Sequence, residues 1–186
     1  MDNFKSFESL LYTVNDSNIN DIALRLFRYQ ANNNQVYASY LQYLGININA
    51  IHSVNEIPFL PISFFKSQTL KTAEWQEELY FTSSGTTGKS TSTHYIADLN
   101  FYLSHAQRCF EYFFGPLSQY HIFALMPSYL ERQNSSLVAM LNSFIQKSVS
   151  EFSGFYLHEH EKLLQDIETC KKLSNKKIVL WGVSFA

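Results

Sequence analysis

One short stretch, residues 81–90, constrains this chain more than any other. It reads Phe-Thr-Ser-Ser-Gly-Thr-Thr-Gly-Lys-Ser and holds two of the chain's six glycines, six hydroxyl side chains and a single lysine. Glycine tolerates positive φ, so successive N–H groups can turn toward one point and surround an anion. A solvated Ser/Thr/Gly linker is the alternative. The lysine at the far end and the hydrophobic strand expected before the stretch favour a phosphate-binding loop.

The segments on both sides of this loop are expected to be strands. Residues 78–82 form a short apolar run, and residues 91–96 alternate and are rich in β-branched and aromatic side chains. The Walker A pattern, G-x-x-x-x-G-K-[ST], fits only at Gly88-Lys89-Ser90, because Ser83 stands where the first glycine belongs. That motif also needs a helix directly after its lysine. The sequence therefore disfavours a P-loop nucleotide hydrolase.

The composition describes a folded protein with little net charge. Of 186 residues, 46% are hydrophobic, which is ample for a core, and the formal net charge of −2 provides no electrostatic footprint for nucleic acid. Two cysteines far apart suit a reducing compartment and provide no disulfide framework. The N-terminus lacks a signal-peptide pattern, and no apolar run is long enough to span a membrane. We expect a cytoplasmic protein.

Residues 1–56 are expected to be mostly helical. Apolar residues recur at helical spacing from residue 4 to residue 44, interrupted by polar stretches at 15–18 and 32–34, and Gly45 suits the position just after a helix end. The next segment, 57–66, contains two prolines three residues apart, which exclude a regular helix or a central strand. We expect it to be extended and mostly buried, as a strap across the domain or, less favoured, as the lining of an apolar acyl pocket.

Residues 57–186 are expected to have an α/β fold that contains the loop. Asp98 should cap a helix that runs to about Phe114, and Ser135 or Ser136 should begin another. Apolar runs at 122–126, 155–156 and 176–183 read as strands, the first and last of the buried parallel kind, and residues 163–170 as a helix. The expected fold class is α/β, with a helical N-terminal segment followed by a mixed, largely parallel sheet with flanking helices.

The stretch from Phe81 to Lys89 resembles the phosphate loop of adenylate-forming enzymes. Residues 57–61, 127–132 with 135–137, and 182–186 narrow the resemblance to the acyl-protein synthetases, the LuxE type or long-chain-fatty-acid–luciferin-component ligases. The resemblance covers most of residues 25–186. It implies that residues 1–186 are the N-terminal portion of a single adenylate-forming domain, whose C-terminal portion and lid are absent. We therefore expect the chain to be part of a longer protein or a truncated form of one.

The resemblance also implies an activity. The family activates a fatty acid with ATP to an acyl-adenylate, and then passes the acyl group to a cysteine thiol and on to a partner protein such as a reductase or carrier. It implies ATP and Mg²⁺ as cofactors, with the metal ligand outside this chain. Lys89 and Thr86 would be catalytic, Pro127 and Tyr129 would line the substrate pocket, and the ATP phosphates would be held by Ser83, Ser84, Gly85, Thr86, Thr87, Gly88 and Lys89.

Two other readings stay open. An acid–CoA ligase would use the same first step, and a non-catalytic nucleotide- or phosphate-binding fragment would need only the loop. Cys109 and Cys170 fall in expected helices and are interpreted as packing residues. His158 and His160 invite a metal site, but two histidines two residues apart do not share a helix face, so we expect no metal ligands here.

Overall fold

A computed structural model describes residues 4–83, 91–126 and 134–182. These residues fall into two compact units. A helical unit comprises residues 4–76 and 91–94, and an α/β unit comprises residues 77–83, 95–126 and 134–182. The α/β class and the helical N-terminal segment are confirmed. The organisation as one portion of a single adenylate-forming domain stays a prediction. None of the described helices is long and apolar enough to cross a membrane.

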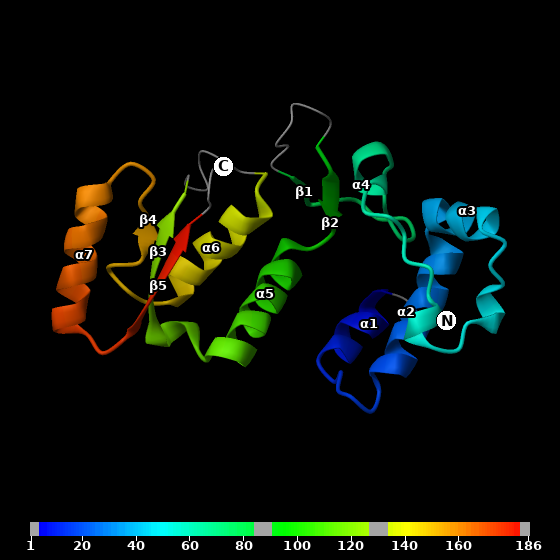
Figure 1. Cartoon of the computed structure of the whole chain (residues 1–186), viewed down its shortest axis with the longest axis horizontal. Helices are drawn as coiled ribbons and strands as arrows, with labels where there is room; N and C mark the ends of the chain where they lie inside the picture. Colours follow the sequence, from blue (N-terminus) through cyan, green and yellow to red (C-terminus); the bar gives the residue numbers. More distant parts are fainter. Residues whose placement is uncertain (1–3, 84–90, 127–133, 183–186) are drawn as a thin grey trace. The chain divides into compact units, whose positions relative to one another are not determined.

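The helical unit is built around the contact between its second and third helices. Its elements are α1 (Phe4–Leu11), α2 (Ile19–Asn33), α3 (Gln35–Tyr43), the 3₁₀ turns η1 (Ile48–Ala50) and η2 (Val54–Glu56), and α4 (Phe64–Ser67) (Figure 1). Apolar residues of α2 and α3 pack with those of the turns into one core, which comprises Leu24, Phe27, Ala31, Tyr37, Leu41, Ile51 and Ile57. The apolar residues that recur at helical spacing in the sequence therefore do form a core.

Local signals set the helix boundaries in this unit. Asn34 ends α2 and begins α3, and its side chain accepts a hydrogen bond from the Tyr37 N–H at 3.0 Å. Gly45 has a φ of 67°. Its N–H bonds to the Gln42 carbonyl, and the next N–H, that of Ile46, reaches the Leu41 carbonyl. This pair of bonds is a Schellman motif, which glycine permits because it adopts positive φ without steric cost.

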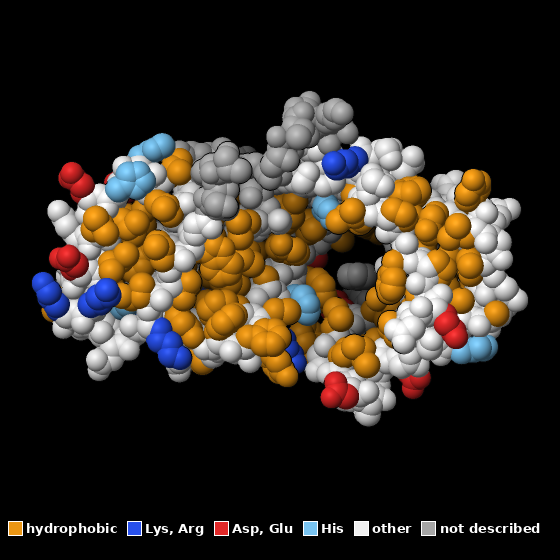
Figure 2. Space-filling view, in the orientation of Figure 1, with side chains coloured by type: hydrophobic (Ala, Val, Ile, Leu, Met, Phe, Trp, Pro, Cys, Tyr) orange, Lys and Arg blue, Asp and Glu red, His pale blue; other side chains and the backbone are white. Residues whose placement is uncertain are grey.

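The segment 57–66 differs from the expectation. It was expected to be extended and mostly buried, but Phe59 is 70% exposed and Ile62 is 80% exposed, and Phe64 begins the short helix α4. Hydrophobic side chains reach the surface of the helical unit over α3 and α4 (Figure 2). Proline excludes regular structure only where it occurs, and the residues that follow Pro61 are free to form a helical turn.

The α/β unit holds a parallel sheet between helices. Its elements are β1 (Leu79–Thr82), β2 (Thr93–Ile96, whose first two residues group with the helical unit), α5 (Leu99–Phe114), η3 (Leu117–Gln119), β3 (Tyr120–Leu125), α6 (Ser136–Lys147), β4 (Gly154–Phe155), α7 (His160–Leu173) and β5 (Lys177–Gly182). The strand order is β4-β3-β5, and both neighbours of β3 run parallel to it. Separately, β1 and β2 form a two-stranded sheet.

Strand β3 is buried on both faces. Ile122 and Ala124 pack against α5 and α6, whereas Phe123, between them, packs against Leu163 and Cys170 of α7. Alternate residues of a strand point to opposite faces, so a central strand of a covered parallel sheet is apolar throughout. Figure 1 shows α6 and α7 on opposite sides of the sheet. The prediction of a buried parallel strand here is confirmed.

Strand β5 is less buried than predicted. It lies at one edge of the sheet, and Leu180 is 56% exposed. Val179 and Trp181 pack toward the α6 side, while Ile178 packs toward α7. The apolar composition identified the strand type correctly, but burial depends on what covers the strand, and that information is not local.

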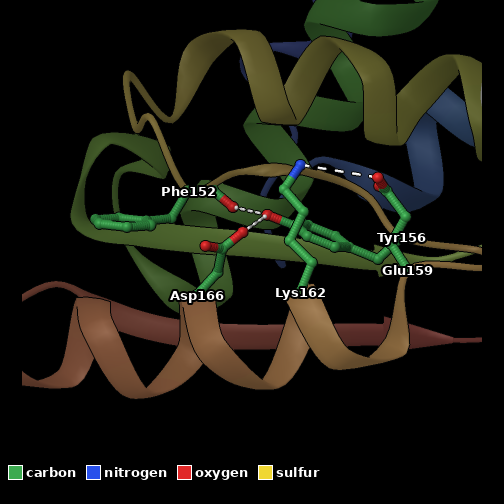
Figure 3. A network of polar contacts seen from close by, with 5 residues as sticks. All are labelled: Phe152, Tyr156, Glu159, Lys162 and Asp166. Atoms are coloured by element: carbon green, nitrogen blue, oxygen red, sulfur yellow. Dashed lines mark hydrogen bonds and ion pairs between the residues drawn. The ribbon is translucent and has the colours of Figure 1, made fainter.

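A polar contact holds α7 to the rest of the unit. The Tyr156 hydroxyl lies 2.9 Å from the Phe152 carbonyl oxygen and 2.8 Å from Oδ2 of Asp166 on α7 (Figure 3). Lys162 and Glu159 form an exposed ion pair at 4.0 Å beside it. Burial and the adjacent Asp166 carboxylate raise the pKa of Tyr156. The hydroxyl therefore stays protonated and able to donate its one proton to either acceptor.

Candidate functional site

Most of the residues expected to bind phosphate or substrate lie outside the described part of the chain. Of the proposed phosphate loop only Ser83 is described, as an exposed residue directly after β1. Ser84, Gly85, Thr86, Thr87, Gly88 and Lys89 lie outside it, as do Pro127 and Tyr129. The site is therefore built here from the residues that flank these segments.

Strand β1 leads into the glycine-rich segment and is anchored at its end. Phe81 is 3% exposed, and its ring packs against Tyr102 of α5 with centroids 5.3 Å apart. The next residue, Thr82, donates its backbone N–H to the Asn134 carbonyl at 2.9 Å. Asn134 directly precedes the N-cap of α6. The entry to the glycine-rich segment is thus tied to the start of α6.

The same region is the carboxyl edge of the parallel sheet. Strands β3 and β5 pair in register up to Leu125 and Gly182, so they end at one edge. In the sequence, residues 127–133, which include the expected pocket residues, separate the end of β3 from Asn134. Ligands of parallel α/β sheets bind beyond the carboxyl ends of the strands. The described residues therefore place the ends of β1, β3 and β5 around one candidate site.

The electrostatic setting of this edge favours an anion. Helix α6 begins here, and its N-cap Ser135 accepts from the Val138 N–H at 3.4 Å. Of the two serines predicted as caps, Ser135 and Ser136, the structure has Ser135 at this position. No acidic side chain occurs in the first turn of α6. A helix N-terminus carries partial positive charge, so a phosphate group near α6 would be stabilised rather than repelled.

A second polar cluster lies at the opposite edge of the sheet. His121, near the start of β3, is 3% exposed, and its Nδ1 lies 2.6 Å from Ser150 Oγ. Burial and then the positive charge of Lys176 lower the pKa of His121, against a smaller opposing effect of Glu151. Lys176 donates to the Ser148 and Val149 carbonyls at 2.9 Å each, which caps the C-terminus of α6. We interpret this cluster as structural.

The two cysteines differ from each other. Cys170 is 1% exposed and packs in the core beneath α7, as predicted, and burial raises the pKa of its thiol. Cys109 was also predicted to be a packing residue, and that prediction is wrong, because its side chain is exposed on α5 with Sγ 3.7 Å from His105 Nε2. On α5 the buried position is the adjacent Phe110, so Cys109 points away from the core.

No metal ligand set can be assigned. Within residues 4–83, 91–126 and 134–182, no group of three or more His, Cys, Asp or Glu side chains is placed to hold an ion. His160 begins α7, whereas His158 precedes it. We therefore assign none of these described residues to Mg²⁺.

The helical unit contains a cavity, of which the sequence indicated only the part that residues 57–66 line. The cavity has a volume of 390 Å³, and Phe59, Leu60 and Phe65 line it. The segment 57–66 therefore lines an apolar pocket, which was the less favoured of its two expected roles. The remaining walls come from α2, from Asn34 and Tyr37 at the start of α3, from Val54, and from residues 70 and 72. No local signal in the sequence indicates that these residues meet.

Comparison with known proteins gives one informative similarity. No protein-family model matches the chain, and no solved structure matches it. The long-chain-fatty-acid–luciferin-component ligase of Vibrio harveyi is 40% identical to it over 63 residues. The match covers 33% of this chain and 16% of the length of that ligase. The resemblance derived from the sequence is thus confirmed for about one third of the chain: in that part, the chain is similar to a LuxE-type ligase.

Proposed function

We propose that this chain contributes to an adenylate-forming fatty-acid ligase. In the first step the fatty-acid carboxylate attacks the α-phosphorus of ATP, and an acyl-adenylate forms as pyrophosphate leaves. In the second step the acyl group passes to a cysteine thiol with release of AMP, and then to an acyl-accepting partner protein. The observation that carries this proposal is the glycine- and lysine-bearing sequence that follows β1, in a chain partly similar to a ligase. The bond between Thr82, the last residue of β1, and Asn134 supports it.

The proposed roles of the loop residues follow from the negative charge that develops on the phosphate oxygens during adenylation. The backbone and hydroxyl donors of residues 83–89 hold the ATP phosphates, and Lys89 and Thr86 act on the charge that grows on the phosphate oxygens during the attack. Donors positioned in advance lower such a barrier because they need no reorganisation at the moment of reaction. The carboxylate nucleophile is ionised at neutral pH, so the step needs no general base.

Pro127 and Tyr129 are proposed to line the substrate pocket, as the resemblance to the acyl-protein synthetases implies. In the sequence, both residues come shortly after the end of β3 at Leu125. Mg²⁺ is proposed as a cofactor that shares the phosphate charge, as in the family that the chain resembles. The described residues provide no ligand set for it, so no step is assigned to a metal-bound group of this chain.

The loop assignment is tested by pyrophosphate exchange. Incorporation of labelled pyrophosphate into ATP, dependent on a fatty acid, is measured in the intact protein. Lys89→Ala and Gly88→Ala should each lower the rate about 100-fold or more, as expected for the loss of a transition-state donor or of the loop conformation. Lys172→Ala, an exposed lysine on α7, is the matched control and should leave exchange unchanged. Full exchange in both loop variants would refute the assignment.

The acceptor is tested separately from the adenylation. With a labelled fatty acid and ATP, the proposal predicts a label on the protein that neutral hydroxylamine releases, as a thioester requires. Formation of acyl-CoA, without labelled protein, would instead indicate an acid–CoA ligase. ATP binding without exchange would indicate a non-catalytic nucleotide-binding module.

A further inference from the structure

The cavity of the helical unit has the character of a site for an uncharged, apolar group. Its volume of 390 Å³ falls within the range of about 300–1,000 Å³ that is typical of small-molecule sites. None of the described residues that line it is charged. The ligand, or the part of it that enters, must therefore be uncharged as well, because a charge there would lose its hydration without gaining a partner.

The walls divide into a buried floor and an exposed rim. Phe27 and Ile57 belong to the core of the unit and are 3% and 9% exposed. Leu26 and Phe59 line the same cavity, but are 37% and 70% exposed. Covering rim residues of this kind removes apolar surface from water, which is favourable roughly in proportion to the area. An apolar ligand would gain contact with both floor and rim.

Three of the four polar side chains that line the cavity, Asn34, Tyr37 and Thr72, have partners within the protein, and the fourth, Gln30, is exposed. The Tyr37 hydroxyl donates to the Pro58 carbonyl at 2.9 Å, and Asn34 Nδ2 donates to Thr72 Oγ1 at 3.2 Å. Burial and the neighbouring Tyr40 raise the pKa of Tyr37 to about 12, so the hydroxyl stays neutral at ordinary pH. The three bonded groups therefore add little polarity to the space that a ligand would enter, and the exposed Gln30 is the remaining polar side chain of the lining.

One wall of the cavity contacts the strand that follows the glycine-rich segment. The ring of Phe65 stacks on that of His94 in β2, with centroids 4.2 Å apart and planes inclined by 14°. His94 groups with the helical unit. The chain that leaves the proposed phosphate loop thus packs directly on a residue that lines the cavity.

From these observations we infer that the cavity holds the aliphatic chain of an acyl ligand. The identification of the ligand as a fatty acid rests on the proposed function, whereas the apolar, uncharged character of the site rests on the cavity itself. The assignment is additional to the substrate pocket proposed at Pro127 and Tyr129, since it concerns the cavity that residues of the helical unit between 23 and 72 line.

Direct binding tests the inference without any need for catalysis. Decanoate and dodecanoate, below their micelle concentrations, are titrated into the chain by calorimetry in the absence of ATP. Each added methylene should tighten binding about fourfold until the cavity is filled, since burial of one CH₂ contributes about 0.8 kcal/mol. Dodecanol should bind about as tightly as dodecanoate, because the lining is uncharged. No binding, or affinity independent of chain length, would overturn the inference.

Two variants locate the binding. Ala23 lines the cavity on α2 and is half-buried, so Ala23→Phe should fill part of the space and weaken dodecanoate binding about tenfold or more. Phe59→Ser should weaken it by a similar factor through loss of the rim. Ile62→Ser is the matched control, because Ile62 is similarly exposed in the same segment but is not among the lining residues. Unchanged circular dichroism establishes that the variants fold.

The results separate this inference from the proposed function. Undiminished dodecanoate binding in both Ala23→Phe and Phe59→Ser would overturn the cavity assignment, even if fatty-acid-dependent pyrophosphate exchange is present. Chain-length-dependent binding that both variants weaken would support the assignment, even if exchange is absent and the proposed function fails.

Discussion

The helical unit and the α/β unit bury their apolar residues in different ways. In the α/β unit, Phe123 and Leu141 are fully buried and Phe144 is 1% exposed, and the packed groups surround β3 on both faces. In the helical unit, Phe27 is equally buried on one side but borders the cavity on the other. The difference suggests that one core is packed for stability, whereas the other leaves space that a ligand can fill.

The chain carries a natural reporter for each unit. Its two tryptophans are Trp75 in the helical unit and Trp181 in the α/β unit. Trp75 donates its indole N–H to the Thr72 carbonyl, and Trp181 packs against the core beside α6. Urea unfolding followed by fluorescence in Trp75→Phe and Trp181→Phe backgrounds would therefore follow each unit separately.

The largest effect on stability is expected when one buried phenylalanine in each core is replaced by alanine. Phe144→Ala should cost about 3–5 kcal/mol of unfolding free energy, because it leaves a cavity in a filled core. Phe27→Ala should cost less, although Phe27 is similarly buried, because the side that borders the cavity makes fewer contacts. The two single-tryptophan backgrounds measure this difference. Equal losses would mean that the space beside Phe27 is closed in solution.

A smaller loss of stability is expected when the N-cap residue of one helix in each unit is replaced. Asp98 accepts from the Phe101 N–H at 2.9 Å in the α/β unit, and Asn34 accepts from the Tyr37 N–H at 3.0 Å in the helical unit. Replacement of either residue by alanine should cost about 1 kcal/mol. Asn34→Ala should cost more, since Asn34 also donates to Thr72. Urea midpoints in the two backgrounds check the ranking, and the reverse ranking would show that the Thr72 contact adds nothing.

The smallest expected effect is a pH dependence confined to the α/β unit. The pKa of His121 is lowered in the folded state, so below the ordinary value of about 6.5 the unfolded chain binds protons that the folded chain does not. Stability should therefore fall as the pH drops from about 7.5 to about 5.5. His121→Gln should flatten this slope in the Trp181 signal and leave the Trp75 signal unchanged. An unaltered slope would assign the acid sensitivity to another group.

Local signals made much of the secondary structure predictable. Asp98 was recognised as an N-cap, Ser135 as one of two candidate N-caps, and Gly45 as the residue after a helix end. Each acts through hydrogen bonds or dihedral angles within a few residues. The parallel strands were recognised from continuous apolar runs. The strand on each side of the glycine-rich segment was likewise predicted and is present.

Burial was predicted less well, because it depends on distant neighbours. Phe59 and Ile62 were expected inside and are exposed, Cys109 was expected to pack and does not, and β5 is only partly covered. For the candidate site, the glycine-rich segment could be found from composition. Its link to the start of α6 could not, because the bond joins two main-chain groups and depends on neither side chain.

That main-chain bond has a consequence for how the protein can vary. The Thr82 N–H and the Asn134 carbonyl are present whatever side chains occupy the two positions, so substitutions there leave the donor and the acceptor in place. Proline at position 82 is the exception, because it removes the donor. Substitutions at these two positions can therefore leave the distance between β1 and α6 unchanged. A proline scan would detect the link, whereas an alanine scan would not, because alanine keeps the main-chain donor.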